Sequence, residues 1–93
     1  MRVIVNLASD RAAHIAGWRA RAVQIDGTSE AAAAEVLKAV TFTDGSSLFD
    51  LVTDGTKLKA GWKVYINGIP QKGNDLAVSR ITDNMQIHVM NTK

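Results

Sequence analysis

Apolar and polar residues alternate in four short stretches of the chain, and this period of two predicts β-strands. The strands are predicted over residues 2–8, 20–26, 62–67 and 85–90. The side chains on their inward side are Val3, Val5, Leu7, Val23, Ile25, Trp62, Val64, Ile66, Met85, Ile87 and Val89. Residues 9–19 separate the first two strands, which is too long for a tight hairpin, so we expect a loop with one helical turn that ends at Gly17.

Helical spacing replaces alternation in the middle of the chain. The run EAAAAEVLKAV has four consecutive alanines and no glycine or proline, and it predicts a helix capped by Thr28 or Ser29, with Glu30 near its positive end. The apolar face of this helix consists of Ala33, Val36, Leu37 and Val40.

A shorter helix is predicted after Asp44-Gly45. Ser47 and Asp50 have the spacing of a capping box, and Leu48, Leu51 and Val52 form an apolar stripe. After the third strand, Asn67-Gly68 predicts a tight turn and Pro70 excludes a central strand. Residues 71–75 are expected to form a loop, and residues 76–81 an irregular segment or a short turn.

The element order ββα(α)ββ within 93 residues predicts a single α+β domain spanning residues 1–93. The first and last strands are expected to pair in parallel, because a helical crossover separates them. A mixed sheet of four or five strands packed on one main helix is the β-grasp, or ubiquitin-like, architecture.

Composition narrows the possible functions. The net charge is only +2, so a nucleic-acid footprint is not evident, and the absence of cysteine excludes disulfides, cysteine metal sites and thiol nucleophiles. We see no signal peptide and no apolar run of about 18 residues that would span a membrane. We therefore expect a cytoplasmic protein.

Candidate catalytic residues are few. His14 and His88 are the only histidines and no acidic residues accompany them at metal-ligand spacing. The serines lie at expected cap and turn positions, and the glycines are scattered singly. We therefore expect no enzyme activity and no cofactor.

Three stretches, LASDRAAHIAGWRARAVQI, VYINGIPQ and SRITDNMQIHV, resemble the small sulfur carriers of the ThiS and MoaD type. TGS domains, which share the Asn-Gly turn, are a second resemblance. In sulfur carriers a C-terminal Gly-Gly tail becomes a thiocarboxylate, whereas this chain ends in the tail Asn91, Thr92 and Lys93.

The resemblance therefore implies a non-catalytic protein-interaction module, serving as an accessory or regulatory subunit of a larger enzyme system. One alternative is a sulfur carrier for molybdenum cofactor or thiamine biosynthesis with an altered or processed tail. The other is a TGS-like RNA-binding module.

Basic and outward-facing residues are the candidates for partner binding. They are Lys57, Lys59, Lys63, Tyr65, Gln86, His88, Arg19 and Arg21, with Ile4 and Met90 on the same predicted outward face as Tyr65 and His88. Such a surface suits an acidic protein partner better than nucleic acid. The alternative is that the lysines only solvate an exposed sheet edge. The oligomeric state is open at this point.

Overall fold

The structure is a computed structural model that describes residues 1–42, 44–55 and 57–91. The helices are α1 (Asp10–Ala16), α2 (Ala33–Ala39), α3 (Leu48–Val52) and the 3₁₀ helix η1 (Gly73–Ala77). The strands are β1 (Arg2–Leu7), β2 (Ala20–Gln24), β3 (Glu30–Ala32), β4 (Thr53–Asp54), β5 (Lys57–Leu58), β6 (Trp62–Ile66), β7 (Ile69–Gln71), β8 (Arg80–Thr82) and β9 (Gln86–Asn91).

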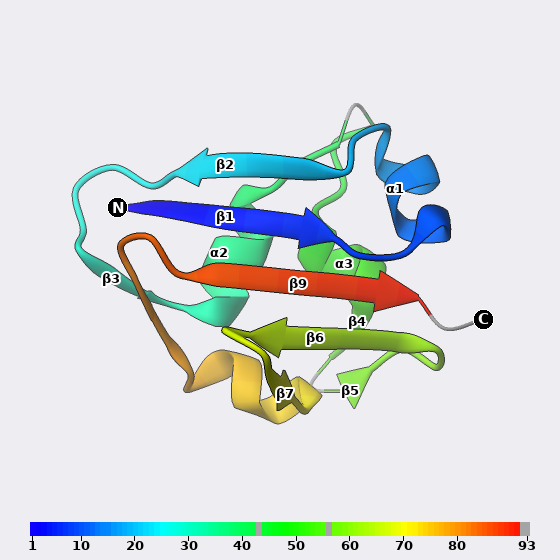
Figure 1. Cartoon of the computed structure of the whole chain (residues 1–93). Coiled ribbons are helices and arrows are strands. Elements are labelled where there is room, and N and C mark those ends of the chain that lie inside the picture. The colour runs from blue at the N-terminus through cyan, green and yellow to red at the C-terminus, as the bar shows by residue number, and fades with distance from the viewer. Residues whose placement is uncertain (43, 56, 92–93) are drawn as a thin grey trace.

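The main sheet has five strands in the order β2-β1-β9-β6-β7 (Figure 1). β1 and β9 lie side by side in parallel, with Val5 opposite Ile87, and the other pairs are antiparallel. The chain is thus an α+β protein with a mixed sheet, and the predicted parallel pairing of the first and last strands is confirmed. The four predicted strands are present with slightly different ends.

One face of the sheet is buried against α2 and α3, which lie behind it in Figure 1. Alternation along the strands creates this face, since every second side chain points to the same side. The residues that meet in this core include Val3, Val5, Leu7, Val64, Ile66, Ile87 and Val89 from the sheet and Val36, Leu37, Leu48 and Val52 from the helices. Val23 is also buried, whereas Ile25, Trp62 and Met85 are only partly buried at the margin of the core.

The predicted start of the main helix is wrong. Glu30–Ala32 form β3, which pairs with β8, and the helix begins only at Ala33 after Ala32, which gives no side-chain cap. The Thr28 hydroxyl donates to the Glu30 carbonyl oxygen (2.6 Å) instead of capping a helix. The Glu30 carboxylate forms an ion pair with Arg80 on β8, with 3.7 Å between Glu30 Oε1 and Arg80 Nε. Pairing with a distant strand has overridden the helical propensity of alanine.

The segment after the third strand is also more regular than predicted. Asn67 and Gly68 form the expected turn, both with positive φ, but Ile69–Gln71 then form strand β7. β7 is an edge strand, which is where a sheet tolerates Pro70. The expected loop and irregular segment contain η1 and β8, and Leu76 and Ile81 are buried in the core.

The two shorter helical predictions are confirmed. α1 ends at Gly17, whose φ of 81° is the left-handed conformation that glycine adopts without strain. α3 begins with the predicted capping box: the Asp50 backbone N–H donates to Ser47 Oγ, and the Ser47 N–H donates to Asp50 Oδ2, both at 3.2 Å.

Ser47→Ala is expected to lower the free energy of unfolding by about 0.5–2 kcal/mol, because it removes the acceptor for a helix N–H. Urea unfolding followed by circular dichroism measures this loss. The matched control is Ser29→Ala at an exposed position, which should change stability by less than about 0.5 kcal/mol. An equal loss in both variants would contradict the capping role.

None of the helices in residues 1–42, 44–55 and 57–91 has the length and apolar character needed to cross a bilayer.

Candidate functional site: the open face of the sheet

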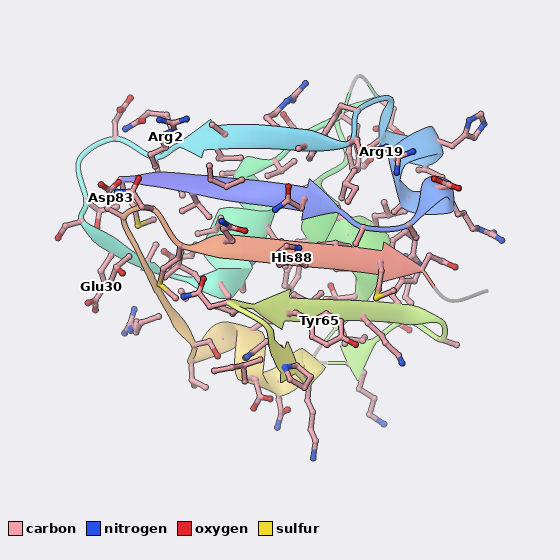
Figure 2. The ribbon with its side chains drawn as sticks, in the orientation of Figure 1. Arg2, Arg19, Glu30, Tyr65, Asp83 and His88 are labelled. Atoms are coloured by element: carbon pink, nitrogen blue, oxygen red, sulfur yellow. The ribbon has the colours of Figure 1, made fainter. Side chains whose placement is uncertain are left out.

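The face of the main sheet opposite α2 and α3 is the candidate site, and we call it the open face. No helix or loop crosses it in Figure 1, and Figure 2 shows Tyr65 and His88 on it. Alternation and strand register place the following side chains on the open face: Arg2, Ile4, Asn6, Ala20, Ala22, Gln24, Lys63, Tyr65, Pro70, Gln86, His88 and Met90.

A row of polar and aromatic residues crosses the centre of the open face. His88 on β9 lies opposite Tyr65 on β6 and opposite Asn6 on β1. Directly opposed side chains in a sheet are near enough to contact one another. Tyr65, His88 and Asn6 are all half-buried, so each is partly covered by its neighbours while one side stays accessible to a partner.

One further pair of side chains lies on each side of this row. Lys63 on β6 is opposite Met90 on β9, and Ile4 on β1 is opposite Gln86 on β9. Together the central row and the two flanking pairs form a continuous patch of mixed apolar and polar character, of the kind that marks interaction surfaces.

The charge of the open face is one-sided. The charged strand side chains on it are Arg2 and Lys63, and the five strands, which are described in full, place no carboxylate there. Asp83 lies at the rim, in the turn before β9, where its Oδ1 accepts a hydrogen bond from the Arg2 backbone N–H (2.6 Å). The face therefore has a weakly positive potential that suits an acidic partner.

Four of the predicted binding residues lie together on the open face: Lys63, Tyr65, Gln86 and His88. The predicted neighbours Ile4 and Met90 share it. Strand alternation alone was enough to group them.

Lys57 and Lys59 do not join this group, which corrects the predicted lysine cluster. Lys57 is on β5, outside the main sheet, and lines a depression with residues 71–74. Lys59 Nζ donates to the Asp50 carbonyl oxygen of α3 (2.8 Å). Lys57 and Lys63 are close in sequence but lie in different sheets, because β5 pairs with β4 and β6 pairs with β7 and β9.

Arg19 and Arg21 are also separate from the open face. Arg19 forms an ion pair with Asp10 (2.9 Å) at the end of the sheet next to α1. Arg21 lies opposite Val5 in the β1–β2 register, on the helix-facing side, and its guanidinium is 4.8 Å from the centre of the Trp18 ring. Both arginines belong to the first hairpin and do not join the candidate binding residues of the open face.

Asn91 was predicted as tail and is instead the last residue of β9. It pairs with Trp62, is 9% exposed, and its N–H donates to Ser9 Oγ (3.0 Å). Thr92 and Lys93 lie outside the described residues.

The two histidines lie in different parts of the fold. His14 is on α1, in a shallow depression with Arg11 and Arg19, and His88 is at the middle of the sheet. No group of histidines and carboxylates in the described chain could hold a metal ion. The pKa of Asp44 is lowered by hydrogen bonds from the Ser46 hydroxyl and backbone N–H, but Asp44 is in the loop before α3 and not on the open face.

Arg2, Asn6 and the two alanines of β2 were not included among the predicted binding residues. The signal was present, since alternation in residues 2–8 and 20–26 puts them on the outward side. Their grouping with His88 also needs the register, which puts Asn6 opposite His88.

Comparisons of the chain with protein-family models, with curated proteins and with solved structures give no match.

Proposed function

We propose that this chain is a β-grasp domain that acts by binding another protein through the open face, without catalysing a reaction. The observation that carries the proposal is the uncovered, continuous row of Asn6, His88 and Tyr65, flanked by Lys63 and Met90. If the open face contacted only water, the large apolar side chains of Tyr65, Met90 and Ile4 would not be expected to gather on it.

The chemistry of the open face indicates the kind of partner. Tyr65 and Met90 offer apolar area, His88, Asn6 and Gln86 offer hydrogen bonds, and Lys63 and Arg2 offer positive charge without a strand carboxylate beside them. The partner that fits is a folded protein with a flat, acidic surface. Tyrosine is enriched among residues that contribute most to such interfaces.

The fold supports this assignment. A mixed sheet of five strands with its helices on one face agrees with the β-grasp architecture and leaves the other face available for docking. We also propose that the chain is related to ThiS and MoaD proteins and that it serves as an accessory or regulatory subunit of a larger enzyme system. An active sulfur carrier and an RNA-binding module are the competing functions.

The test is affinity capture from the organism's own extract with matched variants. Lys63→Glu and Tyr65→Ala are expected to reduce capture of the specific partner by about tenfold or more, as is usual for central interface residues. Lys57→Glu is the control, because it makes the same charge reversal outside the main sheet. Circular dichroism checks that all three variants fold.

Four results would contradict the proposal. Capture that is unchanged by Lys63→Glu and Tyr65→Ala would exclude the open face, and an equal loss with Lys57→Glu would indicate general charge attraction. Capture that is abolished by ribonuclease and falls steeply with salt would favour the RNA-binding function. Adenylation of the C-terminus by an activating enzyme would favour the sulfur carrier.

A further inference from the structure

The two edges of the main sheet are built differently. β7, at one edge, has only three residues and contains Pro70, which has no N–H to offer another strand. β2, at the other edge, has five residues, ARAVQ, with neither proline nor lysine. Natural proteins usually blunt an exposed edge with short length, proline or lysine. The β7 edge is blunted in this way, and the β2 edge is not.

The hydrogen-bond pattern shows which backbone groups β2 leaves unused. The Leu7 N–H donates to the Arg19 carbonyl oxygen (2.7 Å), and the Ile25 N–H donates to the Met1 carbonyl oxygen (2.8 Å). Antiparallel strands alternate in this respect, so Arg21 and Val23 also direct their backbone groups toward β1. Ala20, Ala22 and Gln24 therefore direct their N–H and C=O groups away from the sheet.

We propose that two copies of this chain associate through β2, antiparallel about a two-fold axis at Ala22. Each Ala22 then lies opposite the partner's Ala22, and Ala20 lies opposite the partner's Gln24. This register pairs all of the outward-directed backbone groups of β2 at once. The result is one continuous sheet across both subunits, with β2 strands at its centre.

The side chains of β2 are compatible with this register. Alanine, the smallest side chain with a Cβ, is at the axis where two identical residues meet. Arg21 lies opposite the partner's Val23, so no like charges are opposed. An inward-pointing arginine can itself protect an edge, but Arg21 is held over the Trp18 ring of its own chain (4.8 Å from guanidinium carbon to ring centre).

This inference depends on the backbone and side chains of β2 and stands apart from the proposed function. If both hold, the two open faces are continuous, and a partner with two acidic patches would gain affinity through bivalent binding. A foreign strand could also pair with β2. The self-complementary side-chain pattern favours a second copy, and the experiment separates the two.

Disulfide cross-linking tests the register, because the chain has no cysteine of its own. Residues in hydrogen-bonded antiparallel pairs have Cα atoms about 5.5 Å apart, within the range that a disulfide spans. Ala22→Cys is expected to form a cross-linked dimer on mild oxidation. Ala20→Cys and Gln24→Cys should each cross-link poorly alone but efficiently when mixed. Val78→Cys is the control, at a side chain that is 71% exposed and far from β2 in sequence.

The oligomeric state gives an independent measurement. Sedimentation equilibrium of the wild-type chain should show a concentration-dependent dimer. Ala22→Pro removes an outward N–H without taking a hydrogen bond from β1, and it should weaken the dimer at least tenfold. Ala22→Lys keeps the N–H but opposes two lysines at the axis, and it should weaken the dimer in a way that high salt partly restores.

Several outcomes would overturn the inference. A wild-type chain that stays monomeric up to about 1 mM would exclude the dimer, because a dissociation constant above that value corresponds to very weak binding. Equal cross-linking of Val78→Cys and Ala22→Cys would indicate random collision. A monomeric wild-type chain whose partner capture is lost in Ala22→Pro would assign β2 to a foreign strand instead of a second copy.

Discussion

Ile87→Ala is expected to lower the free energy of unfolding by about 2–5 kcal/mol. Ile87 is fully buried on β9, the central strand, and lies opposite Val5 on β1 and Ile66 on β6. Removing its side-chain carbons leaves a cavity that the paired backbones on both sides cannot readily close. Urea unfolding measures the loss, which should appear as a lower midpoint with a similar slope.

The control is the next residue on the same strand. His88→Ala changes a half-buried side chain on the open face and should cost less than about 1 kcal/mol. A one-residue shift in register would exchange the two faces of β9. A larger loss for His88→Ala than for Ile87→Ala would therefore show that the open face and the core face have been assigned the wrong way round.

Leu37→Asp is expected to prevent stable folding at neutral pH. Leu37 is fully buried on α2, among the side chains that face the sheet. An unpaired carboxylate at such a position costs several kcal/mol, which is comparable with the 5–15 kcal/mol of total stability that is typical of domains. Far-ultraviolet circular dichroism and a thermal melt detect the loss of the folded state.

Ala39→Asp is the matched control, with the same introduced group two residues further along the helix. Ala39 is exposed, so its carboxylate stays in water, and the variant should fold with a loss of about 1 kcal/mol from helix propensity and the helix dipole. A cooperative melt for Leu37→Asp close to that of Ala39→Asp would contradict the packing of α2 on the sheet.

The faces of the main strands could be predicted because one face is buried and the other is not. Val3, Val5 and Leu7 are all at most 1% exposed, as are Ile87 and Val89. Period-two patterning carries this information locally, without knowledge of the partner strands. The capping box of Ser47 and Asp50 could also be predicted, because its hydrogen bonds join residues that are three apart in the sequence.

Elements that depend on distant partners could not be predicted. Ala31 lies in β3 because it pairs with Ile81 on β8, which is fifty residues further along the chain. Nothing near Ala31 signals this, and its local propensity is helical. β8 itself is only Arg80–Thr82, too short for alternation to be recognised.

The same limit applies to the candidate site. Tyr65 and His88 could be grouped, because both lie outward on strands that alternate clearly. Lys57 and Lys59 were grouped with Lys63 by closeness in sequence, but β5 is outside the main sheet. Arg21 was predicted as a partner-binding residue from its charge and its position in the first hairpin, whereas the register of β2 puts it on the helix-facing side of the sheet.

Amide mapping measures residue by residue whether the open face is the surface that binds a partner. The ¹⁵N-labelled protein would be titrated with the captured partner while backbone amide signals are followed by nuclear magnetic resonance. We expect the signal changes to concentrate at residues 4–6, 63–65 and 86–90, with little change in α2 and α3. Changes that concentrate instead on the helices or on the hairpin around Trp18 and Arg19 would contradict it.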